Sequence, residues 1–174
     1  MKMAMSPTRE KFPLSDKKPF KKTIPSTMAA IVSFVIVIAG GLLLAFIFNW
    51  PFSTVSFWII LVGILLALGC FLTYKYQVWY FQVYFYDLTD DFIIIRKRVF
   101  TPLEISIPYE RVQDVYVDQD LLDRIMGLYD VHLSSATISS GMEAHIDGVE
   151  KAAADGLRKM ILDKVSEKIK RRNN

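Results

Sequence analysis

The hydrophobic pattern is dominated by an uncharged stretch from Thr23 to Tyr74, which contains no Asp, Glu, Lys, Arg or His. One membrane crossing takes about 20 apolar residues, so this stretch is long enough for two. A turn is predicted at FNWPFS, residues 48–53, between spans over residues 27–48 and 54–74. Both spans must be helical, because lipid offers no partner for a free backbone N–H or C=O. The pattern therefore predicts a transmembrane helical hairpin over residues 23–75.

After the hairpin, the pattern changes to short runs of aromatic and β-branched residues separated by turn residues, which is typical of strands. The predicted strands are residues 78–86, 92–98, 103–107, 112–118 and 129–133, and a weaker hairpin is predicted over residues 137–146. A short helical turn is predicted over residues 121–127, where Gly127 can end it with a positive φ.

The last predicted element is an amphipathic helix. Asp147 is a candidate N-cap, with Glu150 three residues later as in a capping box. One apolar stripe follows at intervals of three and four residues: Val149, Ala153, Leu157, Met160, Ile161, Val165 and Ile169. Lys164 and Lys168 are expected on the outer face. Antiparallel strands followed by one such helix predict a curled sheet capped by the helix, over residues 78–174.

Charge sets the expected topology. The formal net charge is +3, and the excess of positive charge lies before the hairpin. The positive-inside rule then predicts both termini in the cytoplasm. Residues 1–22 are basic and contain three scattered prolines, so they are expected to be a disordered tail. Because the domain after the hairpin is not basic, no nucleic-acid partner is predicted.

Basic residues near the predicted spans are candidates for contact with anionic lipid: Lys17, Lys18, Lys21, Lys22, Arg96, Lys97 and Arg98. The tail lysines have two interpretations, because they either only hold the N-terminus inside or also bind headgroups. The first turn of the domain, Asp87 to Asp91, is acidic and would repel phosphate. Headgroup recognition at that turn is therefore not expected.

The sequence predicts no catalytic, cofactor or metal site. His132 and His145 have no cysteine or further histidine at ligand spacing, and a cation site among Asp114, Asp118, Asp120 and Asp123 competes with a solvated rim. The only cysteine, Cys70, excludes a disulfide within the chain, in keeping with a reducing compartment.

Arg111, Gln113 and Arg124 are the candidate interaction residues of the domain. Two interpretations apply to the arginines: they line a binding surface, or they hold loops in place through carboxylate and backbone bonds.

The domain resembles the bacterial PH domain family of YdbS-like and YdbT-like membrane proteins over roughly residues 80–170. The resemblance rests on IPYERVQDV at residues 107–115, followed by Gln119, Leu122, Arg124, Gly127, Leu128 and Val131. Val99 and Phe100 stand where the family often has a glycine. The resemblance implies a PH-like fold, a curled antiparallel sheet of about seven strands capped by a C-terminal helix.

The hairpin and the resemblance together define the expected function. The chain is expected to be a multi-pass protein of the inner or plasma membrane and a non-enzymatic interaction or scaffold module on the cytoplasmic face. Its expected partners are the lipid bilayer and a partner membrane protein or a second copy of itself. The alternative is a lipid-binding or lipid-transport accessory protein at the inner leaflet.

Overall fold

The computed structural model of the protein describes residues 6–135 and 144–173. The chain forms two compact units. One is an apolar helical hairpin over residues 22–78. The other is a domain built from both sides of the hairpin, from the chain up to Lys21 and the chain from Trp79 onward.

Two long helices form the hairpin, α2 (Lys18–Phe48) and α3 (Phe52–Val83). Both are long and apolar enough to cross a membrane. Glycines bring them together, because a Cβ on Gly41 would lie 3.7 Å from Val55 and one on Gly63 would lie 3.1 Å from Phe34. Gly40, by contrast, faces open space. The hairpin therefore packs through one glycine from each helix.

Helix α3 continues well beyond the predicted span, so the prediction of a strand over residues 78–86 is wrong for most of its length. The helix ends at Val83 and the first strand begins at Phe85, with Tyr84 N–H still donating to the Tyr80 carbonyl. Adding residues to an existing helix requires no new nucleation, so the helix extends into a segment whose composition favours a strand.

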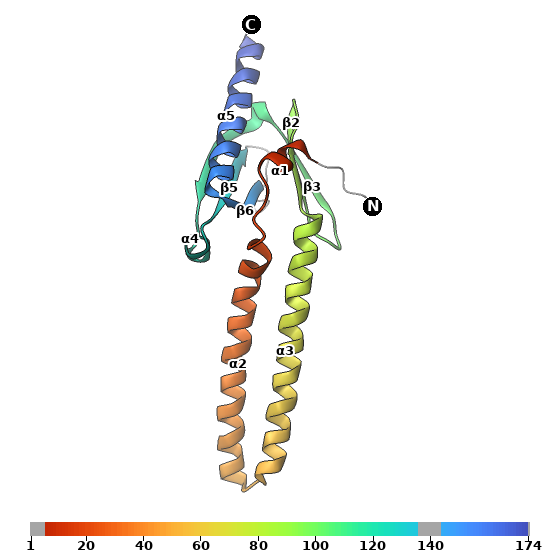
Figure 1. Ribbon diagram of the computed structural model, residues 1–174, viewed down its shortest axis with the longest axis vertical. Coiled ribbons are helices and arrows are strands. Elements are labelled where there is room, and N and C mark those ends of the chain that lie inside the picture. Colours follow the sequence, from red (N-terminus) through yellow and green to blue (C-terminus); the bar gives the residue numbers. More distant parts are fainter. Residues whose placement is uncertain (1–5, 136–143, 174) are drawn as a thin grey trace. The chain divides into compact units, whose positions relative to one another are not determined.

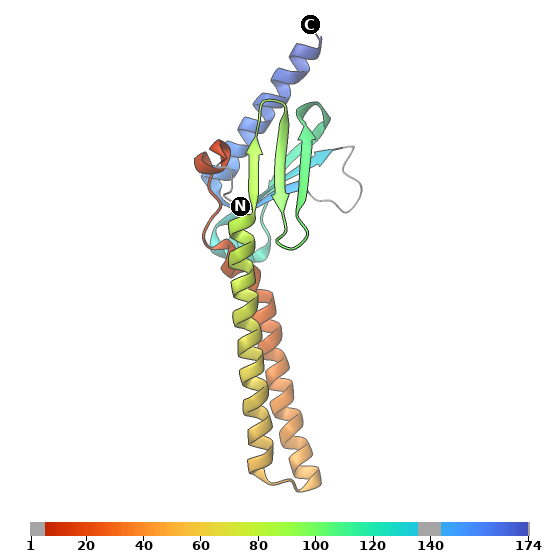
Figure 2. The same ribbon diagram turned by 90° about the vertical axis from the view of Figure 1, so that its right-hand side faces the viewer.

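The domain contains two three-stranded antiparallel sheets. The first has the order β1 (Phe85–Leu88), β2 (Phe92–Lys97) and β3 (Leu103–Pro108). The second has the order β4 (Val112–Asp118), β5 (Leu128–Ser135) and β6 (Ala144–Glu150). A 3₁₀ turn, η1 (Tyr109–Arg111), links the sheets, whose strands cross in Figure 2.

The described residues contain six strands rather than the expected seven or so. Residues 137–143 of the predicted weaker hairpin lie outside the described residues, and its remainder belongs to β6. The short helix α4 (Leu121–Met126) forms where it was predicted, with a capping box of Asp120 and Asp123 and with Gly127 at φ 71°.

The C-terminal helix α5 (Lys151–Asn173) covers the core as predicted. Leu157 and Ile161 are fully buried against residues of both sheets. Lys164 and Lys168 do not project freely from an outer face, because Lys164 donates to the Thr89 carbonyl over 2.7 Å and Lys168 pairs with Asp91. The polar edge of the helix therefore holds the β1–β2 turn.

The expected N-cap of α5 at Asp147 is wrong. Asp147 lies inside β6, whose pairing with β5 continues to Glu150, so the helix begins at Lys151. The Asp147 carboxylate is buried and accepts a hydrogen bond from Lys18. The Asp147 side chain, which the local pattern assigned to a helix N-cap, therefore forms a tertiary ion pair instead.

Residues 6–21, here called the strap, are ordered against the domain rather than forming a disordered tail. They begin with helix α1 (Pro7–Lys11), capped by the Ser6 hydroxyl. Leu14 is buried and pairs with Val149 of β6. Figure 1 shows the strap in red beside the strands and α5. The segment belongs to the domain core although the hairpin separates it from the rest in sequence.

Candidate functional site

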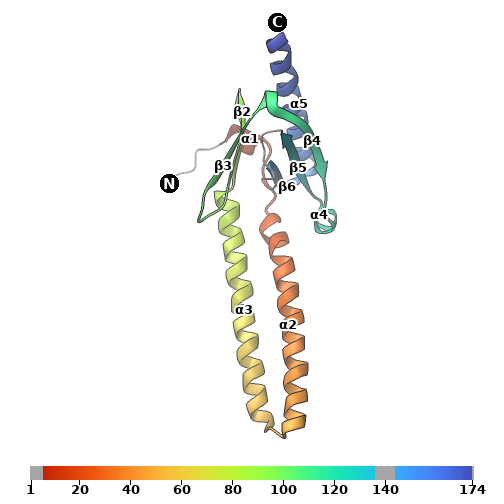
Figure 3. The ribbon, with the colours of Figure 1, turned by 180° about the vertical axis from the view of Figure 1, so that it is seen from behind.

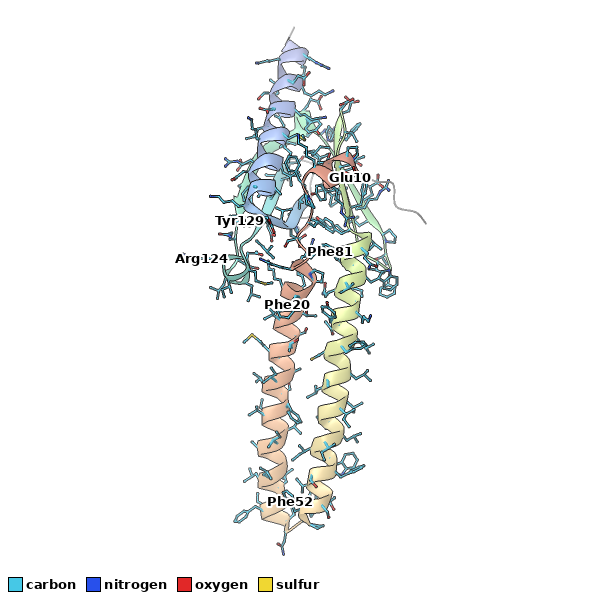
Figure 4. The ribbon with its side chains drawn as sticks, in the orientation of Figure 1. Glu10, Phe20, Phe52, Phe81, Arg124 and Tyr129 are labelled. Atoms are coloured by element: carbon cyan, nitrogen blue, oxygen red, sulfur yellow. The ribbon has the colours of Figure 1, made fainter. Side chains whose placement is uncertain are left out.

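The strap crosses from the first sheet to the second. At its start, Ser6 Oγ donates to Asp87 Oδ1 over 2.7 Å, and Thr8 Oγ1 accepts from Leu88 N–H over 3.1 Å. Arg9 donates to the Tyr84 carbonyl over 2.7 Å and to the Phe81 carbonyl over 3.4 Å. These contacts attach α1 to β1 and to the end of α3; Phe81 is labelled in Figure 4.

Phe12 fixes the middle of the strap to α5. A Cβ on Gly156 would lie 2.3 Å from the Phe12 ring, so the phenyl group occupies space that any other residue at position 156 would fill. The Phe12 carbonyl accepts a hydrogen bond from the Tyr86 hydroxyl. Beside this contact, an open groove of about 710 Å³ lies between the strap and the start of α5, and Lys11, Leu14, Lys17 and Glu150 are among its lining residues.

Two buried lysines end the strap. Lys18 is 2% exposed, and its Nζ lies 2.7 Å from Asp147 Oδ1 and 3.8 Å from the centre of the Tyr84 ring. Lys21 is 4% exposed, and its Nζ lies 2.5 Å from Asp123 Oδ2 and 3.0 Å from Asp120 Oδ2. A buried lysine requires such partners, because an unpaired charge away from water is very costly.

Lys18, Lys21 and their partners Asp120, Asp123, Asp130 and Asp147 are here called the clasp. Helix α2 begins at Lys18, so the clasp holds the first turn of this helix to the domain through two buried lysines. Lys18 and Lys21 were candidates for lipid contact, but the structure shows both in buried ion pairs. Lys17 remains exposed, with its Nζ 3.1 Å from the Met126 carbonyl.

The clasp carries more negative than positive charge. Burial, together with the neighbouring Asp147, raises the pKa of Asp130 despite a hydrogen bond from Gly148 N–H. Burial also raises the pKa of Tyr84 well above its usual value, so the phenol stays neutral and donates to the His145 carbonyl over 2.6 Å. Asp123 Oδ1 is buried and has no hydrogen-bond partner among the described residues.

A row of rings lies across the second sheet next to the clasp. Tyr116, His132 and His145 stand on neighbouring strands, and their rings stack with centroids 4.9 and 5.3 Å apart. Lys97 extends the row, with its Nζ 3.4 Å from His145 Nδ1. The spacing of the two histidines in the sequence gave no indication of this contact, because strand pairing creates it.

Asp118, Asp130 and His132 offer three atoms of metal-ligand chemistry within 4.8 Å of one another. Their side chains have other partners, however. His132 Nε2 lies 3.1 Å from Asp118 Oδ1, Asp130 Oδ1 accepts from Gly148 N–H, and Asp130 Oδ2 lies 3.9 Å from Lys21 Nζ. A protein cation and a backbone donor thus already engage the central carboxylate, and we assign no metal to the group.

The structure separates the predicted interaction residues. Arg111, the last residue of η1, and Gln113, near the start of β4, are exposed, whereas Arg124 is exposed on α4, beyond the other end of that strand. Seven residues of strand span roughly 20 Å. Neither guanidinium has a hydrogen bond or ion pair within the described residues. Arg124 projects from α4 in Figure 4.

The three predicted basic residues of β2 and its following turn are also separated. Arg96 pairs with Glu104 over 2.5 Å, and its guanidinium lies 5.3 Å from the centre of the Phe85 ring. Lys97 contacts His145. Arg98 is exposed in the turn with φ 73°, an unusual backbone conformation for a residue other than glycine. Of the three, only Arg98 has no contact with another side chain within the described part of the chain.

Two antiparallel sheets closed by a C-terminal helix define a PH-like module, a class whose members generally mediate interactions. The comparison with protein families agrees: the model of the bacterial PH domain matches residues 24–165. The chain belongs to the bacterial PH domain family. No curated protein and no solved structure matches it.

Proposed function

We propose that the protein is a membrane-anchored, non-enzymatic PH-like interaction module on the cytoplasmic face of the cell membrane. The clasp carries this proposal. Lys18 and Lys21 belong to the domain, and the uncharged stretch begins at Thr23, directly after them. The domain thus contains the first turn of an apolar helix that has the length and composition of a membrane span.

The proposed topology has two crossings and both termini in the cytoplasm. Helices α2 and α3 are joined by a short uncharged turn, whereas basic residues flank their other ends. Positive residues stay on the cytoplasmic side. A reporter that is active only outside the membrane should be silent when fused after Asn174 and active when inserted at Asn49. Activity after Asn174 would contradict the topology.

The proposed partner is another membrane protein or a second copy of the chain, and Arg111 is the proposed contact. Its guanidinium is exposed and has no partner within the described residues, and arginine is enriched at protein interfaces. A photo-crosslinking residue at position 111 should give a discrete protein adduct in native membranes. The same residue at exposed Lys170 on α5 is the matched control.

The crosslinking experiment also separates this function from its alternative. Adducts with lipid rather than protein at position 111 would favour a lipid-binding accessory protein. Equal labelling of the same proteins from positions 111 and 170 would show that Arg111 marks no specific surface.

A further inference from the structure

Helix α4 buries a carboxylate and exposes two apolar side chains. Asp123 is fully buried, while Leu121 is 76% and Ile125 is 73% exposed. A surface helix of a soluble protein normally buries its apolar stripe and exposes its charges. The clasp accounts for the buried Asp123, which pairs with Lys21. Nothing in the described structure covers Leu121 and Ile125, which are four residues apart and therefore share one face.

A second apolar projection stands at the β2–β3 turn. Phe100 is 74% exposed, and its ring packs edge-on against Trp79, with centroids 5.4 Å apart. Tryptophan is enriched at the membrane–water interface. Figure 3 shows this turn and α4 at the same end of the domain, opposite the C-terminus of α5.

Chain connectivity keeps both projections close to the ends of the apolar stretch. Helix α4 is bound through Asp120 and Asp123 to Lys21, and the stretch begins at Thr23. Trp79 follows the last residue of the stretch, Tyr74, within the same helix. That interval is about 8 Å of helix at 1.5 Å per residue, which is comparable to the headgroup layer of a bilayer.

Exposed cations accompany both projections. Arg124 stands beside Ile125, and Arg98 lies two residues before Phe100. Apolar side chains flanked by arginines match the membrane interface, where the side chains enter the acyl boundary and the cations meet anionic headgroups.

We propose that the domain docks on the bilayer surface through two apolar projections, Leu121 with Ile125 on α4 and Phe100 with Trp79 at the β2–β3 turn. The occupant of this surface is the interface of an anionic phospholipid bilayer. The inference rests on the proposed function, because the membrane hairpin brings the surface to the lipid.

The test places an environment-sensitive fluorophore at single cysteines in the full chain. In a Cys70→Ser background, the label is attached at Ile125→Cys or Phe100→Cys. Ile169→Cys is the matched control, since Ile169 is an exposed apolar residue on α5. Leu65→Cys, inside the apolar stretch, reports insertion of the hairpin. The protein is reconstituted into phosphatidylcholine–phosphatidylglycerol vesicles whose lipids carry spin labels either in the headgroup region, to probe positions 125, 100 and 169, or in the acyl chains, to probe position 65.

We expect blue-shifted emission and quenching by headgroup-region spin labels at positions 125 and 100, with neither effect at position 169. Quenching at position 65 together with unquenched labels at 125 and 100 would overturn the docking surface and leave the hairpin standing. An unquenched label at position 65 would overturn the proposed function and this inference with it.

A second copy is the competing occupant of the same surface. It predicts blue-shifted emission at 125 and 100 without lipid quenching, and a shift that disappears when the protein is diluted in the vesicles. That outcome would overturn lipid docking. Emission and quenching that are independent of the protein-to-lipid ratio support it.

Discussion

Replacing Lys18 with alanine tests whether the strap holds the domain together. The change removes a cation 2.7 Å from Asp147 Oδ1 and leaves a carboxylate that is 4% exposed. Removing one partner of a buried ion pair costs about 3–5 kcal/mol. His145, with its Nε2 3.9 Å from Asp147 Oδ2, can offset part of the loss if it is protonated. We therefore expect a cost of about 3 kcal/mol.

A domain of this size has a total stability of about 5–15 kcal/mol, so the change is a large fraction of it. The measurement is pulse proteolysis in urea of the full chain in detergent, where the cleaved fraction reports unfolding of the domain. The matched control is Lys170→Ala, at an exposed position on α5, which should alter the free energy of unfolding by no more than about 0.5 kcal/mol.

A double variant separates the lost ion pair from lost packing. Lys18→Met with Asp147→Leu replaces both charges with apolar groups, and such replacements are often neutral or stabilising. Methionine can also follow the path of the lysine stem over Gly148, where a Cβ would lie 2.8 Å from Lys18. We expect the double variant to be more stable than Lys18→Ala. Equal, small effects of Lys18→Ala and Lys170→Ala would refute a docked strap.

Three further predictions concern the strap and the core. Gly156→Ala should cost about 1–3 kcal/mol by displacing the Phe12 ring, and a Phe12→Ala background should reduce that cost; urea unfolding of the four-member cycle measures both. Leu157→Ala should cost about 2–5 kcal/mol, against about 0.5 kcal/mol or less for exposed Lys159→Ala, and equal losses would contradict the docking of α5. Burial alone would raise the pKa of Asp87, but hydrogen bonds from the strap outweigh it and lower this pKa. The stabilisation from Asp87 is therefore present above the unfolded value of 3.8 and is lost as the pH falls through the folded pKa. The urea midpoint should fall in that range, and Asp87→Asn should show a weaker dependence on pH.

Patterns among neighbouring residues predicted most of the helices and strands of this protein. The uncharged stretch predicted α2 and α3, because a long run without charges has few alternatives to an apolar helix. Gly127 marked the end of α4, since a positive φ favours glycine. Short runs rich in β-branched residues and bounded by turn residues placed β3 and β4 to within one residue at each end. The period of three and four residues predicted the buried face of α5 at its centre, Leu157 and Ile161, whereas Val149 at one end of the stripe belongs to β6 and Ile169 at the other is exposed.

Only the tertiary structure decided what the polar residues do. Lys18 and Asp147 are 129 residues apart in the sequence, and no periodicity or cap signal links positions so distant. Contacts that form only in the folded domain also bury Asp123, leave Leu121 and Ile125 exposed, and stack His132 on His145. A basic segment with scattered prolines looks disordered when read alone, because its few apolar residues cannot offset the entropy of ordering. It is ordered here because the rest of the domain supplies buried carboxylates for its lysines and the space beside Gly156 that Phe12 fills. These groups become adjacent to the strap only when the chain has folded.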